Sequence, residues 1–236
     1  MADDEKVQDV PPLPGPPLDR RQRATITRVL ELLEGERASV SSVTDPDRAW
    51  RVHVRDSLTG LEVEGLRKAR RIADIGSGAG FPGLVLAVAL PAAQVDPIES
   101  VGRKCDFIQR AIEAAEISNA TVRNARSEEL AAGELRESYE AVTARAVGRL
   151  STLAELASPL LRDGGVLVAW KGKRDPDEEQ QLARASEQLA MHPEQILDVG
   201  DRAGSKHRHL HVIRKLGPTP AGLPRRPGMA KKRPKG

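Results

Sequence analysis

The 236-residue sequence contains little cysteine, few aromatic residues and no long apolar run. Because Cys105 is the single cysteine, an internal disulfide framework is excluded and a reducing cytoplasm is favoured. No stretch approaches the roughly 18 consecutive apolar residues of a membrane-spanning helix, and residues 1–17 are acidic and proline-rich, unlike a signal peptide. We therefore expect a cytoplasmic protein with no membrane partner, and we expect a monomer.

Residues 217–236 lack acidic side chains altogether. They hold six of the 37 Lys and Arg residues, so the rest of the chain is mildly acidic although the net charge is +3. A cationic arm suits contacts with a phosphate backbone, and a solvated tail that only aids solubility is the alternative. We predict RNA contacts from Arg225, Arg226, Lys231 and Lys232, and we expect this tail to lie away from other binding sites.

The most informative stretch is residues 71–83, RIADIGSGAGFPG. A short apolar run predicts a buried strand, and Pro82 fixes a backbone angle that suits the start of a helix. Between them, Gly76, Gly78 and Gly80 permit positive φ and close approach of a ligand to the backbone. The stretch therefore predicts a nucleotide-binding turn whose N–H groups face a ligand.

The spacing of these glycines separates the classes of ligand. A dinucleotide fingerprint requires a third glycine at position 81, which is Phe81 here. With Asp74 at the end of the strand and Ser77 in the turn, the pattern resembles the first motif of S-adenosylmethionine-dependent methyltransferases. N–H groups would meet the cofactor's carboxylate, and Asp74 would lie near its ammonium group, directly or through water. An ordinary glycine-rich turn is the alternative.

The following residues predict a βαβ unit, with helices over residues 82–90 and 104–115 and a strand over 94–98. Glu99 closes that strand about 20 residues after the turn, where a carboxylate can accept hydrogen bonds from both ribose hydroxyls. A surface glutamate is the alternative. Pro97 cannot donate to a strand ladder, so we expect a bulge or a late start of this strand.

Strands alternate with helices through the rest of the chain, which predicts a largely parallel, doubly wound α/β sheet. The ligand then lies beyond the carboxyl ends of the strands, where Gly76, Glu99, Ser127 and Arg145 all fall. Residues 126–130 are interpreted as a turn with an acid pair. The remaining predicted elements are strands over 121–124, 140–144, 166–170, 194–199 and 210–215 and helices over 150–161 and 177–192.

The chain is predicted to consist of a lead-in, N-terminal helices, a core and a tail. Residues 1–18 form a disordered, proline-rich lead-in. Residues 19–60 form extra helices, one capped by Asp19 and one that begins at Asp45 and continues towards residue 58. His53 and Asp56 on the second helix could line a pocket or bond to one another. A methyltransferase-like core over residues 61–216 and the tail over 217–236 complete the expected domain organisation.

Three histidines, His207, His209 and His211, alternate along one predicted strand and could bind a metal. Lys206 and Arg208 lie between and beside them, and no cysteine or acid is near. We therefore favour a basic face towards RNA or solvent, and no metal site is predicted.

Several separated blocks resemble the 16S ribosomal RNA guanine-N(7) methyltransferase G family, also called glucose-inhibited division protein B, over residues 53–236. The segment Phe81-Pro82-Gly83 after the glycine turn is the most discriminating. The other blocks are His53-x-x-Asp56-Ser57-Leu58, Glu99-Ser100-x-x-Arg103-Lys104-x-x-Phe107, Arg126-x-Glu128-Glu129, Ala144-Arg145-Ala146, Lys171-Gly172 and Arg225-Arg226-Pro227-Gly228.

The resemblance implies a Rossmann-like, class I S-adenosylmethionine-dependent methyltransferase that acts on a guanine in the 530 loop of 16S rRNA. The partner is that rRNA or the small ribosomal subunit. The site residues that it implies are Gly76, Ser77, Gly78 and Phe81 at the turn, Glu99 at the ribose, Ser127 and Glu128 at the adenine, Arg145 at the active-site edge, and His53 towards RNA.

Methylation of guanine N7 needs no catalytic base, because this nitrogen already has an exposed lone pair. Catalysis then consists of aligning N7 with the methyl group of the cofactor, and Arg145 is the candidate residue for this alignment. Aromatic residues make up only 2% of the chain, so stacking on a base is expected from Phe81 or from the guanidinium plane of Arg145. A small-molecule methyltransferase and a non-enzymatic RNA-binding module are the alternative functions. RNA binding that weakens with salt separates the first from our interpretation, and cofactor binding separates the second.

Overall fold

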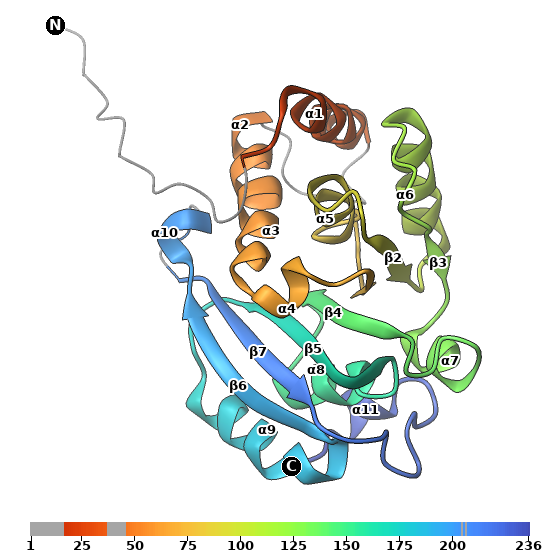
Figure 1. Ribbon diagram of the computed structural model, residues 1–236, viewed down its shortest axis with the longest axis vertical. Helices are drawn as coiled ribbons and strands as arrows, with labels where there is room; N and C mark the ends of the chain where they lie inside the picture. The colour runs from red at the N-terminus through yellow and green to blue at the C-terminus, as the bar shows by residue number, and fades with distance from the viewer. Residues whose placement is uncertain (1–16, 37–45, 204, 206) are drawn as a thin grey trace, which may run out of the picture.

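The computed structural model describes residues 17–36, 46–203, 205 and 207–236. Its centre is a seven-stranded sheet in the order β3-β2-β1-β4-β5-β7-β6 (Figure 1). Strands β1 to β5 pair in parallel, and β7 runs antiparallel between β5 and β6. The strands are β1 Arg71–Ile75, β2 Gln94–Glu99, β3 Arg123–Asn124, β4 Tyr139–Arg145, β5 Leu161–Lys171, β6 Met191–Asp198 and β7 His209–Lys215. The predicted doubly wound α/β fold is confirmed.

Helices cover both faces of this sheet (Figure 1). One face carries α1 Arg20–Gly35, the segment from α2 to α4, α5 Gly83–Ala89 and α6 Gly102–Ala114, and the other carries α8 Leu150–Ala157 and α9 Pro176–Leu189. The short helices are α7 Ser127–Ala132, α10 Gly200–Ala203 and α11 Met229–Lys232. Among the described residues, no helix has both the length and the apolar character needed to cross a bilayer.

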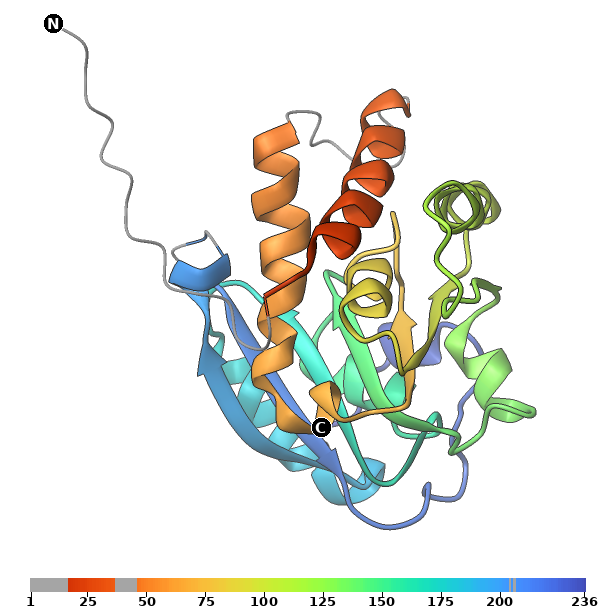
Figure 2. The same ribbon diagram turned by 45° about the horizontal axis from the view of Figure 1, so that its top comes forward.

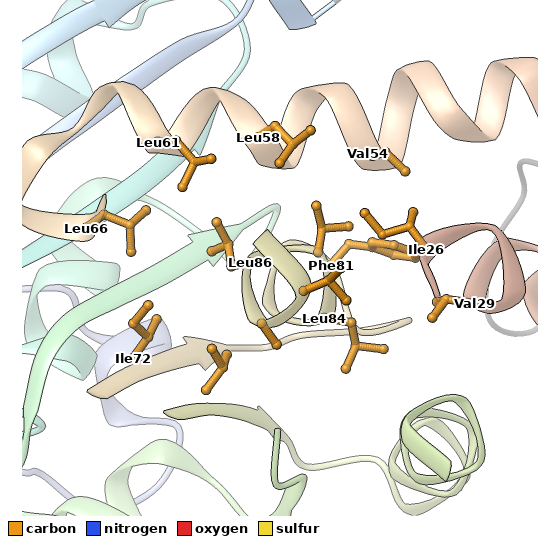
Figure 3. Close-up of a cluster of buried hydrophobic side chains, with 14 of the residues drawn as sticks. Ile26, Val29, Val54, Leu58, Leu61, Leu66, Ile72, Phe81, Leu84 and Leu86 are labelled. Atoms are coloured by element: carbon orange, nitrogen blue, oxygen red, sulfur yellow. The ribbon is translucent and has the colours of Figure 1, made fainter. Parts of the chain in front are cut away.

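The first helix forms as its sequence predicts. Asp19 accepts from the backbone N–H of Gln22, and the Gln22 side chain accepts in return from the backbone N–H of Asp19. The residues at helical spacing, Ile26, Val29, Leu30 and Leu33, are all buried. Figure 3 shows Ile26 and Val29 facing the side chains of the second helical segment and of α5. The lead-in over residues 1–16 lies outside the described residues.

The second helical segment is continuous from Pro46 to Glu62, beside α1 (Figure 2). It comprises α2 Pro46–Ala49, a π-helical stretch η1 Trp50–Arg55, α3 Asp56–Leu58 and a 3₁₀ turn η2 Thr59–Glu62, and α4 Glu64–Arg67 follows. The predicted cap Asp45 lies outside the described residues. A π-helical stretch often marks a functional site, and here it carries His53.

The expected bulge at Pro97 is wrong, because β2 keeps an unbroken register with β1 and pairs Pro97 with Asp74. The N–H of Val95 donates towards the β3 side, to the carbonyl of Asn119. Because N–H groups alternate along a strand, the missing N–H of Pro97 also lies on that side, where β3 is only two residues long. The proline therefore removes little from the ladder.

Other boundaries differ for local reasons. The stretch 126–130, interpreted as a turn, instead leads into the helix α7, which runs from Ser127 to Ala132. The helix expected over 150–161 ends at Ala157, because Pro159 has no backbone N–H with which to continue the helical hydrogen bonds. The chain instead enters β5 at Leu161. Helix α9 ends at Leu189 because Ala190 adopts a left-handed conformation with φ of 52°, so β6 begins at Met191.

Residues 217–236 pack on the domain and are not a separate arm. The fully buried Lys215 donates to Glu137 at 2.7 Å, to the Leu161 carbonyl at 2.6 Å and to the Thr219 hydroxyl at 2.7 Å. Leu223 is buried in the core beside α8 and α9. The boundary expected at residue 216 therefore does not separate two structural units.

The ion pair between Glu137 and Lys215 should make stability depend on pH. Hydrogen bonds from Lys215 and Thr219 lower the pKa of Glu137 to about 2, below its unfolded value of about 4.3. A lowered carboxyl pKa contributes stability above the unfolded value, and this contribution is lost as pH falls through the folded value. We expect Glu137→Gln to lower the free energy of unfolding at pH 7 by about 1–3 kcal/mol, less than for a fully buried pair because the Glu137 side chain is 35% exposed.

Denaturant unfolding at several pH values measures this effect. Between about pH 4.5 and 2, the free energy of unfolding of the parent protein should fall more steeply than that of Glu137→Gln. Glu64→Gln is the matched control, because Glu64 pairs with Lys68 on the exposed surface. Parallel pH profiles for the parent and Glu137→Gln would contradict the assignment.

Candidate active site at the carboxyl ends of the strands

The glycine turn follows β1 and is fastened to β2. The N–H groups of Gly76 and Ser77 donate to the Ile98 carbonyl at 2.8 and 3.1 Å. Gly76, Gly78 and Gly80 have φ of 65°, 62° and 88°, so the predicted positive φ values are confirmed. A Cβ added at Gly78 would meet no atom closer than the Gly76 carbonyl at 3.9 Å. The turn therefore offers open space next to its backbone.

Asp74 holds this turn from inside. Its carboxylate is fully buried and accepts from the Ser77 hydroxyl, from the Thr143 hydroxyl at 2.9 Å and from the Gly83 N–H at 3.0 Å. Burial raises the pKa of Asp74 to about 6, against the opposing effect of these hydrogen bonds. Asp74 therefore supports the turn from inside, and its place near the cofactor's ammonium group, directly or through water, stays a prediction.

Glu99 joins the ends of the first two strands. Its Oε1 accepts from the N–H groups of Ser100 at 2.8 Å and Val101 at 2.9 Å, and its Oε2 accepts from Gly78 N–H at 3.1 Å. A carboxylate oxygen has two acceptor positions, so Oε2 keeps capacity for a further donor. Glu99 therefore holds the turn and can also accept from a bound ligand.

A cavity of about 160 Å³ lies beside Glu99. It is bounded by the ends of β1 and β2, by the start of α7 and by the C-terminal segment. Among its lining residues are Ile75, Gly76, Ile98, Glu99, Ser127, Glu128, Thr152, Gly228, Ala230 and Lys231. Ser127 and Glu128 are thus brought next to Glu99, and their contact with the adenine of a cofactor stays a prediction.

The C-terminal contribution to this cavity was missed in the sequence. Gly228 N–H donates to Glu128 Oε1 at 2.8 Å, while the Ser127 hydroxyl donates to Glu128 Oε2 at 3.2 Å. The expectation that the tail lies away from other binding sites is therefore wrong. No local signal could reveal this contact, because 100 residues separate Gly228 from Glu128.

A second cluster lies at the end of β4, where Phe81 stacks on His53 with ring centroids 4.6 Å apart and an angle of 13° between the planes. The guanidinium of Arg145 lies 5.8 Å from the centre of the Phe81 ring. Burial, with a smaller effect of the Arg145 charge, lowers the pKa of His53 to about 4. His53 is therefore neutral at physiological pH, and its contact with RNA stays a prediction. The Phe81 ring is buried as well (Figure 3), so it is not presented to a base.

Asp56 fixes Arg145 in this cluster. The buried Asp56 carboxylate lies 2.9 Å from Arg145 and 2.7 Å from Arg208, and Arg145 also donates to the Val52 carbonyl at 3.2 Å. Asp56 was expected either to line a pocket or to bond to His53. The structure instead shows it paired with the two arginines at the candidate site. The Arg145 side chain is 14% exposed, so it keeps a small face towards solvent.

The basic residues of the tail fall into two groups. Arg225 forms a two-pronged ion pair with the buried Glu155 and also donates to the Arg233 carbonyl. Its guanidinium anchors the tail, so the predicted RNA contact of Arg225 is replaced by a structural role. Arg226, Lys231 and Lys232 are exposed, and within the described ranges no ion pair engages them.

The three histidines do not form the predicted exposed face. His207 precedes β7, His209 lies 2.8 Å from the Gly172 carbonyl through its Nδ1, and His211 is buried. His211 lies on the face of the sheet that α9 covers, close to Glu178 and Glu179, which explains its burial. In the part of the chain that the structure describes, no group of three or more His, Cys, Asp or Glu residues is placed to hold a metal ion.

Comparison with known proteins identifies the family to which the chain belongs. The model of the rRNA small subunit methyltransferase G family matches residues 25–210. A protein of Rubrobacter xylanophilus named ribosomal RNA small subunit methyltransferase G is 40% identical over 91% of this chain and 84% of its own length. Proteins of the same name from Roseiflexus castenholzii and Chloroflexus aggregans are 39% and 36% identical, over 92% and 93% of this chain and 93% of each relative.

Solved structures support the fold. A SAM-dependent O-methyltransferase from Thermotoga maritima superposes with a TM-score of 0.57 over 80% of this chain and 71% of its own, at 13% identity. The fibrillarin pre-rRNA processing protein of Methanococcus jannaschii gives a TM-score of 0.54 over 69% and 74%, at 16% identity. At such identities the likeness shows the methyltransferase fold alone. The family match and the curated relatives together show that this chain belongs to the rRNA small subunit methyltransferase G family.

Proposed function

We propose that this protein transfers the methyl group of S-adenosylmethionine to N7 of a guanine in the 530 loop of 16S rRNA, in the cytoplasm. The observation that carries the proposal is the adjacency of two sites at the carboxyl ends of the strands. The cavity beside Glu99 fits a cofactor, and the Arg145 cluster lies at the end of β4, next to β1. In sheets of this kind, ligands bind where the strand order reverses, here between β1 and β4.

The residues of the cavity suit S-adenosylmethionine. The open backbone at Gly78 can receive the carboxylate of its methionine part, and Glu99 can accept from its ribose hydroxyls. Ser127 and Glu128, next along the edge of the sheet, can meet the adenine. When bound, the cofactor supplies an activated methyl group on its sulfonium.

The residues at the end of β4 suit a reaction that needs orientation and no base. Guanine N7 has an available lone pair, so no proton is removed before methyl transfer. His53 is neutral and packed against Phe81, and Asp56 is engaged by two arginines. Arg145, partly open to solvent, is left to orient the base through its guanidinium plane.

Exposed cations favour rRNA over a small molecule as the substrate. Arg149 follows β4, Lys173 follows β5, and Lys231 and Lys232 lie beside the cavity, all of them exposed. The strand ends therefore carry charges of the sign that a phosphate backbone attracts. A small-molecule methyltransferase has no use for this arrangement.

The direct test maps the methylated nucleotide. Small ribosomal subunits from cells that lack the methyltransferase should acquire one 7-methylguanine in the 530 loop when they are incubated with this protein and S-adenosylmethionine. Borohydride and aniline cleave RNA at 7-methylguanine, and primer extension locates the break. Methylation elsewhere in the rRNA, or of small molecules only, would contradict the proposal.

Glu99→Ala should weaken binding of S-adenosylmethionine by about 1.5–3 kcal/mol, because charge-assisted hydrogen bonds to the ligand and to the turn are lost. Isothermal titration calorimetry measures the change. Glu113→Ala is the matched control, since it removes the same charge from an exposed position on α6. Unchanged affinity of the Glu99 variant would show that the ribose lies elsewhere.

Arg145→Lys should lower kcat by about 100-fold while the affinity for S-adenosylmethionine stays the same, because lysine keeps the charge but lacks the planar fork that meets Asp56 and the Val52 carbonyl. Single-turnover methylation of small subunits measures the rate. Arg162→Lys, at an exposed ion pair on β5, is the control. An equal loss of cofactor affinity would indicate that Arg145 belongs to the cofactor site.

A further inference from the structure

A short C-terminal segment closes one side of the cavity beside Glu99. Gly228 N–H donates to Glu128 Oε1 at 2.8 Å, and the Ala230 carbonyl accepts from the Thr152 hydroxyl at 3.2 Å. Gly228, Ala230 and Lys231 all line the cavity, and Ala230 is buried. We call residues 228–232, which include α11, the tail wall.

The chain before the tail wall is fastened independently of the cavity. Thr219 bonds to the buried Lys215, Leu223 is buried against the core, and Arg225 pairs with the buried Glu155. These three anchors lie within residues 217–227. The tail wall is therefore a short segment that reaches the cavity from a fixed starting point.

The order of the strand ends shows which part of the cofactor meets the tail wall. The glycine turn follows β1, Glu99 ends β2, and Ser127 and Glu128 follow β3. A cofactor with its methionine part at the turn and its ribose at Glu99 therefore extends its adenine towards Ser127 and Glu128. Glu128 already contacts the tail wall through Gly228, so the adenine lies against both.

We propose that the tail wall forms the adenine side of the cofactor site and that bound cofactor holds it in place for RNA binding. The inference rests on the proposed function for the identity of the cofactor and of the RNA. A ligand that contacts the docked segment favours docking, and by reciprocity docking raises the affinity for the ligand by the same factor. The same segment carries Lys231 and Lys232, which are exposed and have no ion pair among the described residues. Cofactor and RNA binding are thereby coupled through five residues.

Two truncations test the wall. A stop after Pro227 removes the tail wall and keeps the three anchors, whereas a stop after Arg233 keeps the tail wall and the carbonyl bonded to Arg225. The probe is S-adenosylhomocysteine, the demethylated product, which has the same adenine and does not react. By calorimetry, the stop after Pro227 should lose at least about tenfold in affinity, equivalent to about 1.4 kcal/mol, and the stop after Arg233 should stay within about twofold.

The unfolding midpoint of each truncation without ligand, compared with that of the full chain, shows whether the fold is intact. If the stop after Pro227 lowers the midpoint, Thr152→Val gives the same test without truncation, because it removes the hydroxyl that donates to the Ala230 carbonyl of the tail wall. Equal affinity of both truncations for S-adenosylhomocysteine overturns the proposal.

The coupling to RNA has its own variant. Lys232→Ala keeps the backbone of the tail wall and leaves the cavity-lining Lys231 in place, so affinity for S-adenosylhomocysteine should be unchanged. Binding of small ribosomal subunits should weaken, and the slope of log affinity against log salt should flatten by about 0.7–0.9. S-adenosylhomocysteine should raise the affinity of the full-length protein for small subunits several-fold, and less in the Lys232 variant.

Binding of small subunits that does not respond to S-adenosylhomocysteine overturns the coupling. Such a result leaves the proposed function intact, because that function is judged by the position of 7-methylguanine in rRNA. Conversely, the full-length protein could fail to methylate rRNA while the stop after Pro227 shows the predicted loss of S-adenosylhomocysteine affinity. This result would contradict the proposed function and support the role of the tail wall in cofactor binding.

Discussion

The buried carboxylate of Asp74 is the interaction on which the candidate site depends. Burial of an unpaired carboxylate is unfavourable by several kcal/mol, so such a group must be supplied with donors. Here Ser77, Thr143 and Gly83 supply them from the turn, from β4 and from the start of α5. The carboxylate thereby fixes the turn relative to the strand that carries Arg145. The distance between the cofactor cavity and the end of β4 is set by this contact.

Asp56 has the corresponding role for the other half of the site. Its carboxylate holds Arg145 and Arg208, and its backbone carbonyl accepts from the Trp170 indole at 2.8 Å. These contacts join the segment from Pro46 to Glu62 to β4, to β5 and to the residue before β7. The extra N-terminal helices are thus part of the architecture of the candidate site. A truncated methyltransferase core without them would leave Arg145 without its partner.

The C-terminal residues show that one cluster of like charges can serve two purposes. Arg225 and Lys215 are used to fasten the chain, because each meets a carboxylate and further acceptors that compensate for its burial. Lys231 and Lys232 are left exposed beside the cavity. The overall excess of positive charge in the tail gives no indication of this division, which follows from the positions of Glu155 and Glu137 in the fold.

The sequence by itself determined the features that depend on neighbouring residues. The strand at residues 71–75, the positive φ of the three glycines, the cap of α1 at Asp19 and the place of Glu99 at the end of β2 all follow from local propensity and spacing. The family resemblance likewise rests on contiguous blocks. These features were predicted correctly, apart from element boundaries such as the end of α8.

Only the tertiary structure decided how the distant parts meet. The stacking of Phe81 on His53, the pairing of Arg225 with Glu155 and the contact of Gly228 with Glu128 join residues far apart in the chain. Whether a charged side chain is buried or free depends on such partners, and no spacing rule specifies them. For the same reason the sequence could not reveal that Asp74 supports the turn from inside, because its donors come from β4 and α5 as well as from the turn.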